Sequence, residues 1–588
     1  MPINSFKEDE THHEEKKSVT ILRLLKYLLA YKKKIIIVFI IMAYCVGVSL
    51  VNPIIIETAI DKYISVRNFK GLLSLIAIAM CINLVWVVLV KIRMYLMATV
   101  TNNVIKTIRE QLYRHLQTLD FKFFDSRPTG KILSRVIGDI NSLTDVLSNF
   151  VITLLPDFVL LISVIIIMIV KNPRLALSSM VGLPIMLVGL FTIETLSRKR
   201  WELHRKKSSN LNAFVHEDIS GIRIVKTFTA ENETLETFNQ LSEEHKMSFI
   251  KAVRVNDAFN SIIEISEALS LIALYYVGVK NLNNGVTLGL LVAFSSYLTL
   301  FWQPIANLGS FYNQLISNIA AAERVFEVID TKSDIEDAPD VVPMPPIVGN
   351  VQFKDVSFAY EDGVEVLKNV DFNITPGETI ALVGPTGAGK TTIVNLISRF
   401  YDVQKGTVLI DNEDIKKVSI ESLRSQLGIM TQDNFLFTGT IRENIRYGKL
   451  DATDEEIEAA ARTVNAHDFI MKLEKGYDTE LTERGGGLSV GQKQLIAFAR
   501  TILSDPKILI LDEATSSIDT KNELMVQAGI EAILKGRTSF VIAHRLSTIR
   551  KADRIFVVEN GKIAEEGNHD TLMSKKGIYY SLQMAQLS

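Results

Sequence analysis

A glycine-rich segment in the C-terminal half of the chain carries the clearest chemical pattern. It follows the short apolar run 379–383, precedes a helical run that reaches Phe400, and matches G-x-x-x-x-G-K-[ST] in the required strand, loop, helix order. Glycines let such a loop wrap phosphates, so that its N–H groups and the helix N-terminus face negative charge. We expect Lys390 to reach the β and γ phosphates of ATP and the Thr391 hydroxyl to bind Mg²⁺. The predicted nucleotide-binding residues here are Gly384, Pro385, Thr386, Gly387, Ala388, Gly389, Lys390, Thr391 and Thr392.

A pair of carboxylates follows a second apolar run. Ile508-Leu509-Ile510-Leu511 has the pattern of a buried strand and is followed directly by Asp512 and Glu513. A carboxylate at the end of a strand beside the phosphate loop can hold Mg²⁺ through water, and a second can orient or deprotonate the attacking water. We assign Asp512 the first role and Glu513 the second, catalytic role.

A short segment upstream of this strand resembles a motif of one family of phosphate-loop ATPases. Leu488-Ser489-Val490-Gly491-Gln492 resembles the LSGGQ signature of ATP-binding cassette (ABC) proteins, which separates them from other phosphate-loop ATPases. The resemblance implies further roles. Tyr360 would stack on adenine, Gln432 would be the Q-loop ligand of Mg²⁺, Asp519 would belong to the D-loop, and His544 would be the catalytic switch histidine at the γ phosphate.

The other half of the chain reads as membrane-spanning. Hydrophobic residues make up 48% of the chain, and they concentrate upstream of residue 310. A helix needs about 20 apolar residues to cross a hydrocarbon core of about 30 Å. Six runs are long enough, near 35–56, 72–92, 145–170, 174–196, 259–280 and 286–308. An amphipathic, basic stretch at 18–34 precedes them and predicts a helix that lies in the membrane interface.

Loop charge predicts the orientation. Lys32-Lys33-Lys34 precede the first span, and the long connections after the second and fourth spans are rich in Lys and Arg. Such residues stay on the cytoplasmic side. We therefore expect a multi-pass protein of the plasma membrane with both termini and the ATPase domain in the cytoplasm. Residues 1–17 are polar, lack the features of a signal peptide and are expected to be a disordered tail.

The two long cytoplasmic connections resemble those of exporter-type ABC half-transporters. Phe123–Gly130 and Gly221–Lys226 lie at their tips, where Pro and Gly break a helix. In that family such tips are coupling helices that contact the ATPase domains. The expected organisation is multi-domain: a tail at 1–17, an interfacial helix at 18–34, an all-α six-helix transmembrane domain at 35–310, a linker at 311–350 and an α/β phosphate-loop domain at 351–588.

Several polar and aromatic residues lie within or beside the spans. An intramembrane carboxylate is costly in lipid and indicates a functional site, so Glu264 and Glu267 are candidates for the substrate pathway, with Asp157 and Glu194 as further intramembrane acids. The aromatic residues of the sixth span could form a wall for an amphiphile, although side-chain packing is the more common use. Cys45 and Cys81 fall in apolar runs and are interpreted as small buried hydrophobes.

The sequence contains one membrane half and one cassette, whereas the family architecture needs two of each. ATP would then lie between Lys390, Thr391 and Asp512 of one chain and the signature of its partner. Val490 stands where the family usually has glycine, and a β-branched residue disfavours positive φ. Either Val is tolerated, or it impairs the signature that this chain gives to its partner while its own Glu513 and His544 are intact. The second interpretation resembles heterodimeric exporters and predicts a different ABC half-transporter as partner.

The predicted function is ATP-driven export of amphipathic small molecules, such as drugs or lipids, by alternating access with ATP and Mg²⁺. The alternatives are a homodimeric lipid flippase or an importer on the same fold. A net charge of −2, from 64 basic and 66 acidic residues, gives no reason to expect a nucleic-acid partner.

Overall fold

The computed structural model describes residues 17–282, 284–361, 363–431, 434–482, 485–513, 520–543 and 546–587. These divide into two compact units. The first holds residues 17–117 and 129–331, and the second holds residues 118–128 and 332–587.

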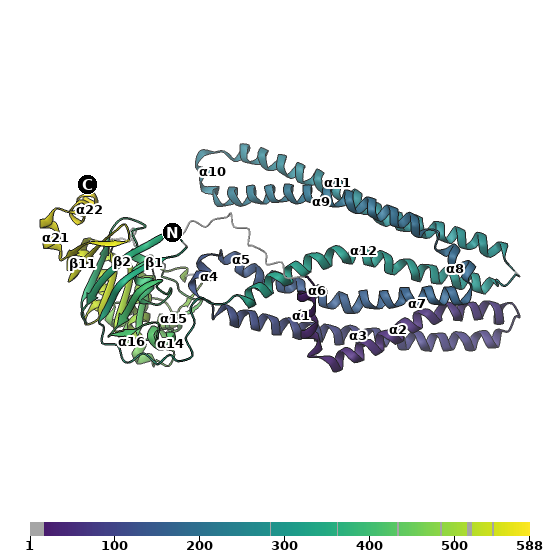
Figure 1. Ribbon diagram of the computed structural model, residues 1–588, viewed down its shortest axis with the longest axis horizontal. Helices are drawn as coiled ribbons and strands as arrows, with labels where there is room; N and C mark the ends of the chain where they lie inside the picture. Colours follow the sequence, from purple (N-terminus) through teal and green to yellow (C-terminus); the bar gives the residue numbers. More distant parts are fainter. Residues whose placement is uncertain are drawn as a thin grey trace. The chain divides into compact units, whose positions relative to one another are not determined.

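The first unit is helical (Figure 1). Within the described residues, six helical segments are long and apolar enough to cross a membrane: Lys32–Ile64, Phe69–Leu116, Ile152–Lys171, Pro173–Ser220, Glu231–Lys280 and Leu288–Asn307. The prediction of six spans is confirmed. The helices of this unit are α1 (Lys17–Leu29), α2 (Lys32–Thr58), α3 (Phe69–Leu116), α5 (Thr129–Leu133), α6 (Ile140–Asn149), α7 (Leu155–Lys171), α8 (Pro173–Ser179), α9 (Leu183–Ser220), α10 (Ile222–Phe228), α11 (Glu231–Lys280) and α12 (Leu288–Asp330). Short π-helical segments lie at Ala59–Ile64, Ser134–Asp139 and Phe150–Leu154.

Two boundaries differ from the expected ones. The interfacial helix α1 ends at Leu29, because a turn at Ala30 and Tyr31 separates it from α2, so the three lysines Lys32–Lys34 belong to the first turn of α2. At the other end, α12 continues without interruption to Asp330, well into the stretch expected to be a linker.

Four of the helices are far longer than a membrane requires. α3 has 48 residues, α9 has 38, α11 has 50 and α12 has 43, and a helix rises about 1.5 Å per residue. α9 and α11 run side by side, with the short helix α10 at their tip (Figure 1). Gly221 separates α9 from α10, as the helix-breaking pattern at this tip predicts.

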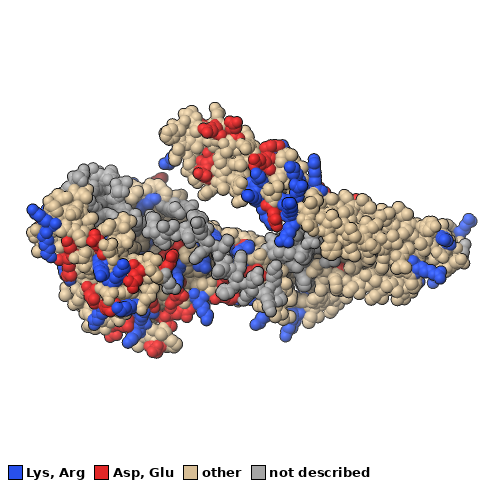
Figure 2. All heavy atoms as spheres, turned by 45° about the horizontal axis from the view of Figure 1, so that its top comes forward, with Lys and Arg blue, Asp and Glu red and all other residues tan. Residues whose placement is uncertain are grey.

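Charged side chains are almost absent from the middle of the spans, and Lys and Arg gather at both ends of this band (Figure 2). The aromatic residues of the sixth span do not line an open wall. They are buried in the core of the unit, which supports the packing interpretation: Phe294, Tyr297, Phe301 and Trp302. The Tyr297 hydroxyl donates a hydrogen bond to the Leu50 carbonyl at 2.9 Å. Both cysteines are free thiols. Cys45 is buried as expected, but Cys81 is exposed, so the interpretation as a buried residue is wrong for Cys81.

The second unit is an α/β domain with two main sheets. A six-stranded sheet has the order β12-β11-β3-β10-β9-β6, and a four-stranded antiparallel sheet has the order β2-β1-β4-β5. The strands are β1 (Val351–Ala359), β2 (Glu365–Ile374), β3 (Thr379–Val383), β4 (Lys405–Ile410), β5 (Glu413–Asp414), β6 (Leu427–Met430), β9 (Ile508–Glu513), β10 (Thr538–Ala543), β11 (Arg554–Glu559) and β12 (Lys562–Gly567). A small third sheet pairs β7 (Gly439–Thr440) with β8 (Glu480–Leu481).

Helices cover the strands of this unit. They are α4 (Phe121–Asp125), α13 (Lys390–Ile397), α14 (Ile420–Arg424), α15 (Ile441–Arg446), α16 (Asp454–Thr463), α17 (His467–Ile470), α18 (Val490–Leu503), α19 (Thr520–Leu534), α20 (Leu546–Lys551), α21 (His569–Lys575) and α22 (Ile578–Leu587). Both faces of the central sheet are buried, as its unbroken aliphatic strands indicate. Leu509 and Leu511 face one hydrophobic core, and Ile508 and Ile510 face the other.

Candidate nucleotide-binding site

The phosphate loop connects β3 to α13, and its shape depends on glycine at three positions. Gly384, Gly387 and Gly389 have φ values of 147°, 83° and 110°, a region that residues with a side chain rarely adopt. A Cβ atom at Gly384 would lie 2.1 Å from the carbonyl oxygen of Val558. One at Gly389 would lie 2.7 Å from a methyl group of Leu367. Side chains at Gly384 and Gly389 would therefore clash with neighbouring residues. The loop is a cradle of glycine backbone, which fits a bound phosphate chain.

Lys390 begins α13 and folds back over this cradle. Its Nζ atom donates hydrogen bonds to the carbonyl oxygens of Gly384 and Pro385, both at 2.8 Å. Burial lowers the pKa of the Lys390 ammonium, and the nearby charge of Asp512 opposes that shift. Among the described residues, this ammonium donates its hydrogen bonds to carbonyl oxygens. A phosphate anion would bind it more strongly, because charge-assisted hydrogen bonds are the stronger ones.

The strand register brings the acidic pair to the same edge of the sheet. β9 pairs in parallel with β10, so that Asp512 lies beside Ile542, and β10 pairs in parallel with β3, so that Ile542 lies beside Leu382. Asp512 and Leu382 thus belong to one row across the sheet, and the phosphate loop begins two residues after Leu382. Ligands of open α/β sheets bind beyond the carboxyl ends of the strands. Glu513 is the last residue of β9 and pairs with Ala543, but its side chain is not among those described.

Three further predicted site residues, Gln432, Asp519 and His544, lie outside the described residues. The strands before two of them do end at this edge: β6 ends at Met430, which pairs with Leu511, and β10 ends at Ala543.

Tyr360 follows β1 and is held in a fixed orientation beside α13. Its hydroxyl donates to Thr392 Oγ1 at 3.2 Å and accepts from Asn395 Nδ2 at 3.3 Å. Its ring meets the rings of Phe358 and Tyr401 edge-on, at centroid distances of 4.9 Å in both cases. The partly exposed ring can serve as a stacking surface for a base. Sequence reasoning missed the positioning role of Asn395, because no motif includes it.

The signature segment forms the start of α18. Ser489 caps the helix in a reciprocal arrangement: its Oγ accepts from the Gln492 amide at 3.3 Å, and Gln492 Oε1 accepts from the Ser489 amide at 2.9 Å. Leu488 packs against the hydrophobic core, and Gly491 is buried. Val490 has helical backbone geometry and no positive φ, so the expected backbone strain is absent. What distinguishes Val490 from glycine is its exposed side chain.

The tip helix α4 docks on the same unit as the phosphate loop. The rings of Phe121 and Phe400 are 4.2 Å apart, and the Tyr401 hydroxyl donates a short hydrogen bond to Asp125. Burial, then the hydrogen bond to Asp125, raises the pKa of the Tyr401 phenol well above its usual value. The sequence pointed to the tip but not to Phe400 and Tyr401, which look like ordinary core aromatics.

The segment that follows α12 also binds this tip, through Ser333 and Asp334. The Asp120 carboxylate accepts hydrogen bonds from the Ser333 hydroxyl at 3.3 Å and from the Asp334 amide at 2.6 Å. Lys122 forms an ion pair with Asp334 at 2.5 Å. Tyr401 therefore contacts both the ring of Tyr360 and the tip helix α4, and its one side chain links the two.

The two predicted substrate-pathway residues lie on α11. Glu264 is exposed, and Glu267 is half-buried and accepts a hydrogen bond from the Thr299 hydroxyl of α12 at 3.4 Å. In the described part of the chain, Glu267 has a hydrogen bond to a neighbouring span and Glu264 has none. Of the other intramembrane acids, Asp157 accepts a hydrogen bond from Asn307 at 2.9 Å, and the side chain of Glu194 is not described.

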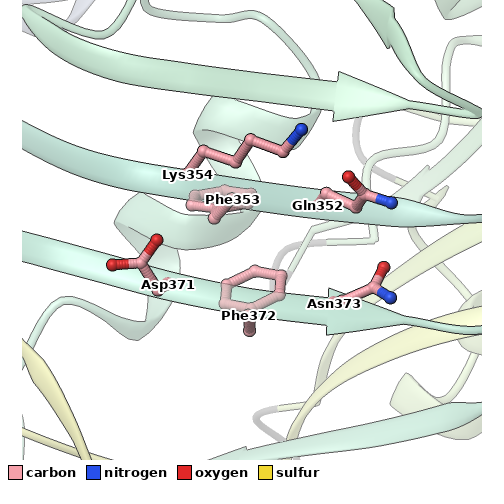
Figure 3. A pocket seen from close by; sticks show the side chains of 6 residues that line it. All are labelled: Gln352, Phe353, Lys354, Asp371, Phe372 and Asn373. Carbon is pink, nitrogen blue, oxygen red and sulfur yellow. The ribbon is translucent and has the colours of Figure 1, made fainter.

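A shallow hollow of about 350 Å³ lies in the α/β unit, over β1 and β2 (Figure 3). Its lining comes from neighbouring positions of the two strands: Gln352, Phe353, Lys354, Asp371, Phe372 and Asn373. None of these residues belongs to the phosphate loop, the acidic pair or the signature, so we assign it no part in nucleotide binding.

Each half of the chain matches a family of known proteins. Residues 35–305 match the family described as ABC transporter transmembrane region, and residues 367–516 match the family described as ABC transporter. The chain is 43% identical to the uncharacterised ABC transporter ATP-binding protein YknV of Bacillus subtilis, over 96% of this chain and 94% of that protein. It is 39% identical to an ATP-dependent lipid A-core flippase of Syntrophus aciditrophicus, over 84% of this chain and 82% of the flippase.

A solved structure shows the same fold. A bacterial Atm1-family ABC exporter with ATP bound superimposes with a TM-score of 0.77 at 28% sequence identity, covering 95% of this chain and 98% of the exporter chain.

Proposed function

This chain belongs to the ABC transporters, as a half-transporter of the exporter type, and from that premise we propose that it exports amphipathic small molecules across the plasma membrane. The proposed cargo is a drug or a lipid, and the proposed cycle is alternating access driven by ATP in a dimer. The observation that carries the proposal is the convergence of the phosphate loop and Asp512 at one sheet edge, in a chain with six membrane-spanning helices.

The proposed ATP chemistry uses groups at this edge. Lys390 would exchange its two loop carbonyls for phosphate oxygens, and Thr391 and Asp512 would hold Mg²⁺. Mg²⁺ would neutralise charge on the phosphates. Glu513 positions or deprotonates the attacking water. The exposed Thr391 and the cradle formed by glycine backbone support this assignment, and Gln432 and His544 complete it by resemblance.

Exposed apolar surface supports a two-chain assembly. The tip around α10 exposes large side chains, with Phe228 78% accessible and Ile219 and Ile224 similarly open. The ATPase unit exposes an aromatic patch made of Phe435, Phe437 and Tyr447. Monomeric soluble surfaces rarely leave such patches uncovered. In a two-chain assembly, the tip of each chain would cover the aromatic patch of the other chain.

The finer proposal is a heterodimer. Its one specific observation is Val490, whose side chain is 54% exposed at the start of α18, on the element that the family gives to the partner's ATP. An isopropyl group there would occupy space that the family's glycine leaves open. The competing candidate is a homodimeric lipid flippase, which the likeness to the lipid A-core flippase favours.

Purification of the tagged chain from its native membrane, followed by mass spectrometry, tests the partner. A stoichiometric second ABC half-transporter is expected. Recovery of this chain alone, as a dimer with full substrate-stimulated hydrolysis, would refute the heterodimer. Val490→Gly is the companion variant: it should accelerate hydrolysis at the site that receives this signature, and an unchanged rate would show that Val is tolerated.

Transport direction separates export from import on this fold. The basic residues around Lys32–Lys34 support an ATPase unit on the cytoplasmic side. In sealed inside-out vesicles, an exporter should accumulate its cargo when ATP is added outside. ATP-dependent depletion of preloaded vesicles would instead establish import.

A further inference from the structure

Helix α1 has two different long faces. Leu24 and Leu28 are buried against the rest of the unit. On the opposite side, Val19, Leu22 and Leu29 are exposed, and with Lys26 they recur every three or four residues, which places them on one stripe. This stripe is apolar with a single basic side chain, and no described residue covers it.

Three more lysines follow this stripe in the sequence, at the start of α2. Lys32 and Lys33 are exposed and Lys34 is half-buried. Within the parts of the chain that the structure describes, none of them, nor Lys26, has an acidic partner. The exposed aliphatic residues Ile36 and Ile37 follow at once, so the lysines come directly before the apolar part of α2. We call Lys26, Lys32, Lys33 and Lys34 the basic corner.

The remaining side of α1 contacts the last turn of α12. Both terminal nitrogens of the Arg23 guanidinium donate to the Asp330 carboxylate, and the guanidinium lies 4.2 Å from the centroid of the Phe326 ring. The Tyr27 ring stacks on Phe326 at 6.2 Å, and its hydroxyl donates to Gln111 on α3 at 2.7 Å. Asp330 is the last residue of α12, and the ATPase unit resumes at residue 332.

We propose that the exposed stripe of α1 and the basic corner bind anionic phospholipid headgroups of the membrane leaflet on the ATPase side. Lipid bound there holds α1 in place, and the Arg23–Asp330 contact passes that restraint to the segment leading into the ATPase unit. ATP hydrolysis is then higher in membranes that contain anionic lipid. The inference rests on the orientation proposed above.

Charge and shape select this occupant. An apolar stripe next to lysines fits a lipid interface, where the side chains reach the acyl region and the ammonium groups reach the phosphates. Each lysine near an anionic surface contributes about a five-fold gain in affinity. The competing occupant is the acidic N-terminal segment of the chain itself, which includes Glu8, Asp9 and Glu10.

The test uses the full-length transporter in nanodiscs of phosphatidylcholine with increasing fractions of phosphatidylglycerol. ATP hydrolysis should rise with the phosphatidylglycerol fraction. The variant Lys26→Gln/Lys32→Gln/Lys33→Gln should lower the affinity for phosphatidylglycerol about 100-fold, since three lysines of about five-fold each are lost, so its stimulation curve should shift to much higher phosphatidylglycerol fractions. Added salt should shift the wild-type curve in the same direction, because it screens exposed charges.

The chain offers a matched control at the opposite ends of the spans. Lys62, Lys70 and Lys280 are also exposed or half-buried lysines with no acidic partner among the described residues. The variant Lys62→Gln/Lys70→Gln/Lys280→Gln should keep the wild-type curve. An equal shift in both triple variants would reduce the effect to general charge and overturn the proposal.

A second variant separates lipid binding from its consequence. Arg23→Gln should retain the phosphatidylglycerol that native mass spectrometry finds on the wild-type protein, yet its hydrolysis should no longer respond to that lipid. Normal hydrolysis by the wild-type protein that does not change with the phosphatidylglycerol fraction would overturn the proposal, as would Arg23→Gln hydrolysis that still rises with it. So would a response that emerges only after residues 2–14 are removed, which would assign the stripe to the acidic segment. Absence of hydrolysis in every lipid would instead count against the proposed function.

Discussion

Tyr401→Phe isolates the contact that joins the nucleotide site to the tip helix α4. The substitution removes only the hydroxyl that donates to Asp125. It keeps the ring, which meets Tyr360 edge-on at 4.9 Å. The base-stacking surface should therefore stay in place, while the tip loses one of its anchors.

The magnitude follows from the surroundings of this bond. A hydrogen bond to a charged group contributes about 1.5–3 kcal/mol. Asp125 is exposed and can be rehydrated, so the lower end, about 1.5 kcal/mol, applies. The contacts of Phe121 with Phe400 and of Lys122 with Asp334 remain, so the tip stays docked but opens more often. Because about 1.4 kcal/mol corresponds to a factor of ten, local opening should become about ten-fold more frequent.

Native-state hydrogen exchange measures this opening directly. The amides of Phe123 and Ser126, which bond to Asp120 Oδ1 and to the Lys122 carbonyl, should exchange about ten-fold faster in Tyr401→Phe. Asp125→Ala should act similarly, and the double variant should add little, because both changes remove one bond.

Tyr579→Phe is the matched control for this experiment. Tyr579 is another buried tyrosine of the same unit, and its hydroxyl contacts His569 Nδ1 at 2.7 Å. It should leave exchange at α4 unchanged. Equal protection of α4 in wild type and Tyr401→Phe, or additive effects in the double variant, would refute the reasoning.

Three further variants probe the nucleotide edge. Lys390→Met should weaken ATP binding about 10- to 100-fold through the loss of charge-assisted bonds; a fluorescent ATP analogue measures this, and unchanged affinity would contradict the phosphate-loop assignment. Gly384→Ala should abolish binding, because its Cβ would meet the Val558 carbonyl oxygen at 2.1 Å, so equilibrium dialysis that still shows bound ATP would disprove the cradle geometry. Glu513→Gln should bind ATP normally but lose nearly all turnover in a phosphate-release assay, and near-normal turnover would remove Glu513 from its role.

The sequence could predict what depends on short patterns. The phosphate loop, the acidic pair and the six spans each lie within a continuous stretch whose residue types dictate strand, loop or helix. The buried strand before Asp512 could be predicted because its aliphatic residues are unbroken, and only a sheet covered on both faces can bury such a strand.

Long-range contacts could not be predicted in this way. Arg23 and Asp330 are separated by 307 residues, and Tyr401 meets Asp125 across 276, so no local pattern links either pair. Val490 shows that a prediction from a single local residue can also be wrong. Its effect was predicted from backbone strain, but the residue opens a helix, where a β-branched side chain fits without positive φ.

The most direct measurement of the central claim is ATP-dependent movement of an amphiphile across a sealed membrane. The transporter, with any subunit that co-purifies, would be reconstituted in liposomes and tested with fluorescent phospholipids and amphipathic dyes. We predict that ATP drives net movement of at least one probe, and that Glu513→Gln binds ATP but moves none. Hydrolysis without movement of any probe, or equal movement by Glu513→Gln and wild type, would contradict a transporter driven by ATP at this edge.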